Sequence, residues 1–245
     1  MYYTITPLLL ATALNEKSLQ AFRQDYGTKI EISMHSLLLR SESEIILVDT
    51  GPPLSESGEG IVFNNVVLKN PVTIAKALKN EGIDAKDIKK VIVTHLHWDH
   101  AYNMELFPNA KFYIQKSEMS YCVCPMPMDV AMYSVNPGGP IPCWFKIFHQ
   151  IVRVDGDTEL VPGIRLVHTP GHSPGHQGVL IDTKCGTYFY AADHYPLYIN
   201  WKDNIPNNVH TSFDEWYKSH EKVKNLADHF LMGHDMCIRE QKVYG

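Results

Sequence analysis

Four side chains that could bind a metal ion lie within six residues of one another. His95, His97, Asp99 and His100 follow the apolar run 91–93 and a threonine. Imidazole and carboxylate groups are ligands that zinc, iron, manganese and cobalt accept. The two histidines at 95 and 97 would project to the same side of a strand end, and the next turn can bring the other two round. One histidine alone is most often a core or surface residue, but this density predicts a metal site.

The surrounding chain predicts strands that alternate with helices. A helix is expected to begin at Asn70-Pro71 and to stop at Gly82, and a second one is capped by Ser212 and Glu215. Because several strands deliver histidines at their ends with helices between them, the pattern favours two sheets sandwiched by helices in one domain. The strands are expected at 29–39, 44–48, 91–93, 111–115, 163–168, 177–182, 187–192 and 229–232.

Residues 119–148 differ from the rest of the chain. They mix methionines, cysteines and aromatic residues with prolines and a Gly138-Gly139 pair, and they show no clear period. We expect a loop-rich insertion within the single domain, 1–245. A lid or wall over a pocket is favoured over a surface excursion, because long loops on compact domains are often functional. A contact in a homodimer is the other interpretation of this segment.

Composition limits the partners. The chain has 245 residues, 44% of them hydrophobic, and a net charge of −5. Nucleic acid is not expected as a partner, because phosphate binding needs a basic face. The apolar stretch 7–14 is too short to span a membrane and lacks the flanks of a signal peptide, so a cytoplasmic enzyme is expected. The five cysteines are expected to be reduced thiols.

The motif His95-Leu96-His97-Trp98-Asp99-His100 resembles the HxHxDH signature of the metallo-β-lactamase superfamily. The resemblance extends over most of the chain and implies an α/β fold, the four-layer αββα sandwich of that superfamily. Three further parts resemble its later metal-binding segments: Thr169-Pro170-Gly171-His172-Ser173-Pro174-Gly175-His176, Ala191-Ala192-Asp193 and Met232-Gly233-His234-Asp235. Leu47-Val48-Asp49-Thr50-Gly51 resembles the strand and turn that precede its metal motif.

The resemblance implies seven ligands for two divalent metal ions. The two ions are expected to be zinc, with iron, manganese or cobalt as alternatives. Asp49 and His176 would orient ligands through hydrogen bonds, and Asp99 would also move a proton. One metal would be held by His95, His97 and His172, the other by Asp99, His100 and His234, and Asp193 would bridge the two with a hydroxide between them.

Within the superfamily, the chain looks most like the quorum-quenching N-acyl-homoserine lactonase group. This likeness implies a small-molecule lactone as substrate, with the ring opened by the bridging hydroxide. The segments that carry it are 97–103, 106–110, 115–118, 154–157 and 161–164.

The chain departs from this group at one position. Those lactonases have a tyrosine three residues after the bridging aspartate, where Pro196 stands here. Tyr195, Tyr198 or His194 could assist the reacting carbonyl in its place, or the metal could act alone. The substrate could therefore be an N-acyl homoserine lactone or another small lactone, such as a pyridine-fused or aliphatic one.

Two other activities on the same fold are the alternatives. A thioesterase of the glyoxalase II kind would use the same metals but would need a cationic site for its glutathione carboxylates, and no basic cluster is evident in the sequence. A mono-iron sulfur dioxygenase would use fewer ligands than the chain offers.

Overall fold

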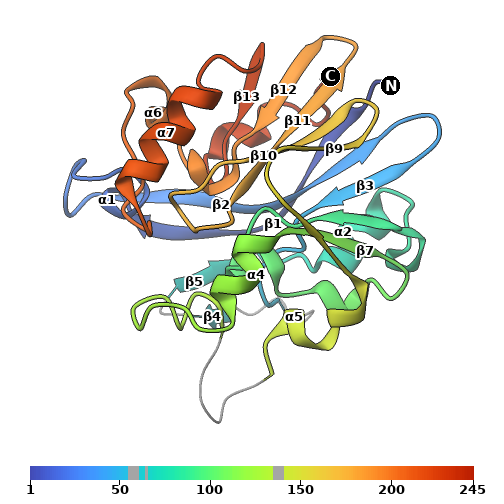
Figure 1. The fold of residues 1–245 in the computed structure, drawn as a ribbon, viewed down its shortest axis with the longest axis horizontal. Helices are drawn as coiled ribbons and strands as arrows, with labels where there is room; N and C mark the ends of the chain where they lie inside the picture. Colours follow the sequence, from blue (N-terminus) through green and yellow to red (C-terminus); the bar gives the residue numbers. More distant parts are fainter. Residues whose placement is uncertain (55–60, 64–65, 135–140) are drawn as a thin grey trace.

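A computed structural model describes residues 1–54, 61–63, 66–134 and 141–245. Two β-sheets pack against each other at its centre (Figure 1). The longest strands, β1 and β2 (Thr4–Glu16 and Lys29–Arg40), pair antiparallel through the middle of the larger sheet. In order across that sheet, the strands are Ile61–Phe63 (β4), Val66–Lys69 (β5), β1, β2, Ile45–Val48 (β3), Lys90–Ile92 (β6), Lys111–Gln115 (β7) and Ile151–Val154 (β8).

The smaller sheet comes almost entirely from the second half of the chain. Its strands pair antiparallel except for the last pair along the chain, which is parallel. In order across the sheet, they are His229–Leu231 (β13), Gly186–Tyr190 (β12), Gln177–Thr183 (β11), Ile164–His168 (β10) and Thr158–Val161 (β9).

Helices cover the outer face of each sheet, so the expected αββα sandwich is confirmed. Figure 1 shows α6 (Tyr198–Lys202) and α7 (Phe213–Val223) on the smaller sheet, and α2 (Ile74–Asn80), α4 (Lys116–Cys122) and α5 (Cys143–Lys146) on the larger one. No helix in the described ranges is long and apolar enough to cross a membrane. Within the part of the chain that the structure describes, the remaining helices are α1 (Lys17–Gln20), α3 (Trp98–Ala101) and five 3₁₀ turns at Ala85–Asp87, Met104–Leu106, Phe148–Gln150, Ala192–His194 and Met236–Arg239.

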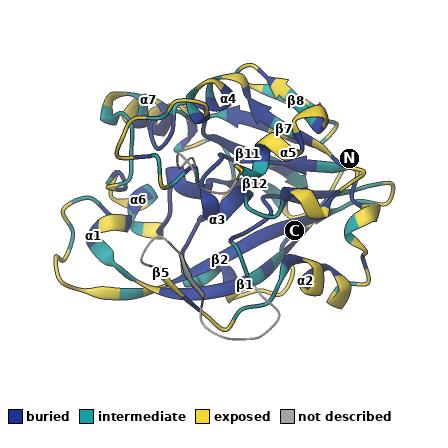
Figure 2. Cartoon of the chain, turned by 90° about the horizontal axis from the view of Figure 1, so that it is seen from below, coloured by how far each residue is buried: buried dark blue, intermediate teal, exposed yellow. Residues whose placement is uncertain are grey.

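Strand alternation in the sequence produces these layers. In β3, Ile46 and Val48 pack between the two sheets, whereas Leu47 faces the helices of the outer layer. In β12, Tyr190 lies between the sheets and Phe189 faces α7. Successive strand residues point to opposite faces, so a strand covered on both sides reads as a continuous apolar run. In Figure 2 the central strands β1, β2 and β11 are mostly buried, whereas α1, α2 and α7 carry the exposed residues of the outer layers.

The start of α2 corrects one sequence expectation. The helix begins after Thr73, whose hydroxyl accepts a hydrogen bond from the Lys76 amide at 3.3 Å. Asn70, expected as the cap, lies in a left-handed turn with φ of +52°. Gly82 follows the end of the helix with φ of +75°, as expected from its residue type. The expected Ser212 cap on α7 is present, with its hydroxyl accepting from Glu215 N at 3.2 Å.

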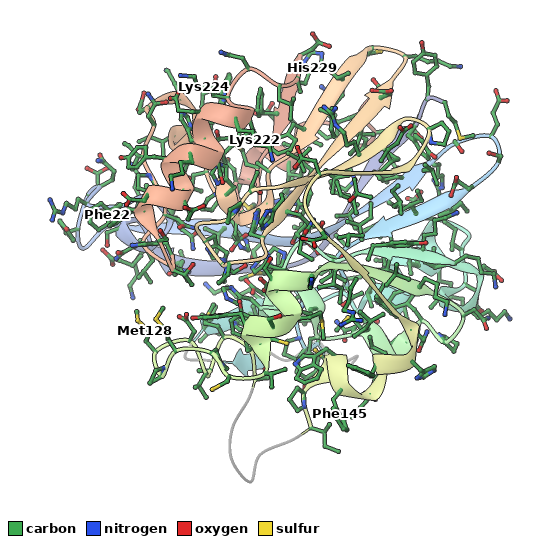
Figure 3. All side chains as sticks on the ribbon, viewed as in Figure 1. Phe22, Met128, Phe145, Lys222, Lys224 and His229 are labelled. Carbon is green, nitrogen blue, oxygen red and sulfur yellow. The ribbon has the colours of Figure 1, made fainter. Side chains whose placement is uncertain are left out.

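The segment 119–148 contains the end of α4, then turns, then α5. Residues 135–140, with the Gly138-Gly139 pair, lie outside the described residues. Met128 and Phe145 are exposed on its surface (Figure 3), but Tyr133 is buried beside His97, with ring centroids 4.8 Å apart. Part of the segment therefore packs on the metal motif, and its role as an inserted lid stays a prediction.

Candidate metal centre

The expected ligands all follow strands, and the fold brings them together. His95 and His97 come after β6, with Asp99 and His100 in the first turn of α3. The other three lie in the loop after β10, after β12 and after β13, and they are His172, Asp193 and His234. These seven residues are at most 9% exposed and form three overlapping groups whose ligand atoms lie within 4.8 Å of one another.

Three histidines make the first group. His172 Nε2 lies 3.1 Å from His95 Nε2 and 3.0 Å from His97 Nδ1. The ring of His172 points its other nitrogen, Nδ1, at the Val209 carbonyl, which accepts its hydrogen bond at 2.6 Å. Two ligand atoms on one zinc ion lie about 3.3 Å apart in tetrahedral geometry. The three ring nitrogens are therefore spaced as ligands of one ion.

Asp193 joins this group to the second. Its Oδ1 lies 3.2 Å from His100 Nε2 and 3.1 Å from His234 Nε2. Its Oδ2 lies 3.4 Å from His172 Nε2 and 3.9 Å from His95 Nε2. Each carboxylate oxygen faces a different group of histidines, which is the placement that a bridging ligand requires.

Asp99 completes the second group. Its Oδ2 lies 3.6 Å from His234 Nε2 and 3.9 Å from His100 Nε2, and its buried Oδ1 has no hydrogen-bond partner among the described residues. Unpaired buried oxygens are costly unless a ligand occupies the space in front of them.

Hydrogen bonds behind the rings show that this donor set fits cations. The Thr94 hydroxyl donates to Asp49 at 2.8 Å, so at 3.1 Å it can only accept from His95 Nδ1. His100 Nδ1 donates to Asp49 Oδ2, also at 2.8 Å. His234 Nδ1 likewise donates to the Ser33 carbonyl at 2.8 Å. With Nδ1 held by these partners, each ring turns Nε2 to the centre, and once that nitrogen is unprotonated only a cation satisfies several such lone pairs together.

The pKa directions agree with this interpretation. Burial, followed by the neighbouring histidines, lowers the pKa of His95 and His97 well below the usual value, so both rings are neutral. Burial also opposes charge on His100 and His234, but Asp193 and Asp99 outweigh it and raise the pKa of both rings. Since ligand nitrogens must be unprotonated, metal binding in the second group releases protons.

Glu118 holds three of the surrounding loops together. Its carboxylate accepts hydrogen bonds from Leu96 N (2.9 Å), Tyr133 Oη (2.9 Å), Ser173 Oγ (2.7 Å) and Gly175 N (3.0 Å). Burial raises the pKa of Glu118, and these four donors act in the opposite direction. In the sequence, Glu118 stands out only as part of the segment 115–118, which resembles the lactonase group. An acid in the first turn of the helix that follows a strand was the available signal, but the groups that donate to it lie 15 to 57 residues away along the chain.

We expect Glu118→Gln to weaken both the fold and the metal site. A glutamine amide nitrogen cannot accept hydrogen bonds, so two buried donors lose their partner, at a cost of about 2–4 kcal/mol. Urea unfolding measures this loss, and metal affinity should fall about 10-fold or more because the ligand loops are released. The exposed Glu31→Gln is the matched control, and unfolding within about 0.5 kcal/mol of wild type is expected for it. Equal stability of the two variants would contradict the role assigned to Glu118.

The structure does not bring the other three predicted catalytic residues to the centre. Tyr195 is fully buried, and its hydroxyl lies 2.8 Å from His220 Nδ1, inside the apolar layer under α7. His194 is fully buried with its ring against Trp216, and its pKa is lowered by burial. Tyr198 is 47% exposed on α6. None of the three lines the cleft that opens onto the metal centre, and a role for one of them at the reacting carbonyl stays a prediction.

A cleft of about 180 Å³ opens onto the centre. Asp99, His172, Asp193 and His234 form its floor. The walls are mostly apolar, and no lysine or arginine is among the described residues that line them. The residues of the floor were predicted from the sequence, but those of the walls were not. The walls are formed by Asn15, Leu19, Gln20, Ile32, Met34, Val66, Trp98, Met132, Asn207 and Val209.

Comparisons with known proteins agree with this geometry. The family described as the metallo-beta-lactamase superfamily matches residues 33–234. An N-acyl homoserine lactonase from Bacillus sp is 31% identical over 189 residues, covering 74% of this chain and 71% of the relative. An N-acyl homoserine lactonase from Bacillus thuringiensis is 28% identical over 232 residues, with 86% and 84% covered.

Solved structures show the same fold. A variant of Bacillus thuringiensis AiiA with N-decanoyl-L-homoserine at its active site has a TM-score of 0.79 at 25% identity, with 96% of this chain and 95% of that chain covered. AidC, described as a dizinc quorum-quenching lactonase, has a TM-score of 0.71 at 19% identity, with 95% and 87% covered. The family match spans more than half of the sequence and includes all seven residues of the cage. The chain therefore belongs to the metallo-beta-lactamase superfamily.

Proposed function

We propose that this protein opens the ring of small lactones, and that N-acyl homoserine lactones with short acyl chains are its substrates. The observation that carries the proposal is a complete cage for two cations at the floor of an apolar cleft. The family makes the chain a metal-dependent hydrolase, and its relatives named as lactonases support an ester bond as the target. The small cleft favours a short substituent on the ring, since pockets for larger ligands usually exceed about 300 Å³.

The chain's residues divide the work between them. Two metal ions bound in the cage would lower the pKa of a water molecule toward neutrality and polarise the ester carbonyl. Asp193 fixes the distance between the two groups of ligands, and Trp98, Ile32 and Met34 offer apolar surface to the substrate. Asp99 lies at the floor with an unpaired oxygen, where it can take a proton and pass it to the departing alkoxide.

The cleft and the ligands of the metal centre argue against the two alternative activities, the thioesterase and the mono-iron oxygenase. A glutathione thioester would carry carboxylates into a cleft whose described lining has no cationic side chain. A mono-iron oxygenase needs one group of ligands, whereas Asp99, His100 and His234 form a second group beside the first.

A substrate panel tests the proposal. Metal-loaded enzyme is given lactones, thioesters and a β-lactam, and acid release is followed at constant pH. Lactones are expected to be hydrolysed fastest, with acylamino-substituted γ-lactones first among them. Turnover of thioesters with none of lactones would contradict the proposal and favour the thioesterase.

Tyr195→Phe separates packing from catalysis. Because the hydroxyl bonds to His220 in a buried layer, we expect kcat/KM on the best lactone to change less than about threefold, while the free energy of unfolding falls by about 1 kcal/mol. Steady-state kinetics and urea unfolding measure the two quantities. A loss of turnover above about 30-fold at unchanged stability, some 2 kcal/mol of barrier, would return Tyr195 to the reacting carbonyl.

A further inference from the structure

Three amide side chains, Asn15, Gln20 and Asn207, interrupt the apolar walls of the cleft, and Oδ1 of Asn15 already accepts a hydrogen bond from Glu16 N. Gln20, at the end of α1, is 9% exposed, and it lines the cleft. Asn207, in the loop before α7, is 2% exposed, and its buried Oδ1 has no hydrogen-bond partner among the described residues. Buried polar groups without partners are rare in native proteins and mark positions where a ligand or a water completes the set.

Backbone pairing brings Gln20 and Asn207 to the same part of the rim. Asn208 N donates to the Leu19 carbonyl at 3.0 Å, and Phe22 N donates to the Pro206 carbonyl at 2.8 Å. The Gln20 carbonyl accepts from Asn200 Nδ2 at 2.8 Å. The backbone on both sides of Gln20 is thus held by hydrogen bonds, while its side chain lines the cleft.

Asn207 connects this part of the rim to the metal cage. Its Nδ2 donates to the Asp193 carbonyl at 2.7 Å, which leaves Oδ1 as the unpaired acceptor. The same nitrogen lies 2.9 Å from His172 Nδ1, but that ring atom already donates to Val209, so this second contact is not a hydrogen bond. Asn207 is thus tied to Asp193, and both residues line the same cleft as Gln20.

We propose that Gln20 is a specificity residue that hydrogen-bonds the amide group next to the lactone ring of the substrate. The inference rests on the proposed function. It concerns the amide substituent of the lactone ring, which takes no part in ring opening. A glutamine amide offers a donor and an acceptor, and a secondary amide carries the complementary pair. A charged substituent is disfavoured, because neither Gln20 nor Asn207 is ionisable and the described lining has no lysine or arginine.

The test compares two lactones of equal chain length. N-butanoyl homoserine lactone carries the amide, and α-pentyl-γ-butyrolactone replaces it with methylene groups. For wild type and Gln20→Leu, kcat/KM is measured on both, and differences in intrinsic ring reactivity cancel when the two enzymes are compared. We expect the variant to lower the amide-to-alkyl ratio about tenfold, through KM rather than kcat, which corresponds to one net hydrogen bond. The dissociation constant of N-butanoyl homoserine should rise by a similar factor in calorimetry.

Controls keep a structural effect apart from recognition. Ile32→Val alters the apolar wall and should change both lactones alike, so its ratio stays within about twofold of wild type. Gln20→Met is a second apolar variant if Gln20→Leu does not fold. A ratio unchanged in the Gln20 variants would mean that the side chain binds only water, which overturns the inference while lactone hydrolysis stands. Absence of turnover on every lactone would overturn the proposed function and this inference with it.

Discussion

Asp193→Ala is expected to abolish lactone hydrolysis, with kcat falling at least about 10³-fold. Each of its carboxylate oxygens faces a different group of histidines, so the substitution removes one ligand from both metal sites at once. A bound metal contributes several kcal/mol to the stabilisation of the transition state, and about 4 kcal/mol corresponds to a thousandfold in rate. The metal content of the purified variant should fall below two ions per chain.

Asp235→Ala is the matched control for this variant. Asp235 follows a ligand directly, but its carboxylate accepts from the backbone amides of Tyr198 and Cys237 outside the cage. We expect normal metal content and a rate within about threefold of wild type, with a modest loss of stability from the missing cap. An Asp193→Ala enzyme with two metal ions and near-normal turnover would show that the bridging role is wrong.

Asp99→Asn is expected to lower lactone turnover at least about 100-fold while the metal stays bound. Asparagine keeps an oxygen that can face His234 and His100, but it cannot carry a proton between the attacking water and the leaving group. Metal analysis and steady-state kinetics on the same preparation separate the two roles.

The leaving group sharpens the test of Asp99. Ring opening of a thiolactone releases a thiol with a pKa of about 8.5, which can leave as a thiolate without a proton. Ring opening of a lactone releases a far more basic alkoxide, which needs a proton to leave. We therefore expect Asp99→Asn to affect the lactone at least about tenfold more than the matching thiolactone. Equal losses on both substrates would restrict Asp99 to a role as metal ligand.

The sequence predicts the layers and the cage well, for a physical reason. Apolar runs such as 46–48 and 91–93 are buried on both faces, and strands of this kind are recognisable without knowledge of their partners. The motif from His95 to His100 is compact, and the later ligands stand in short family-like segments. The structure places all seven side chains together, which local patterns alone could not show.

The parts that the sequence missed depend on contacts between distant residues. Glu118 is one acid among many until the fold brings the loops at 96, 133 and 173–175 around it. Tyr195 stands two residues after Asp193, yet its backbone turns the phenol toward His220 rather than the cleft. Gln20 and Asn207 come to the same cleft only through hydrogen bonds from the chain around α1 to α6 and the loop after it, 180 or more residues away. No periodicity or motif signals such contacts.

Counting the metal ions per chain tests the central claim most directly. The protein is stripped with a chelator, dialysed to equilibrium against zinc and analysed for metal, with Asp193→Ala treated in parallel. The seven-residue cage predicts two zinc ions in wild type and fewer in the variant. One ion or none in correctly folded wild-type protein would contradict a two-metal centre and the hydrolysis that we propose for it.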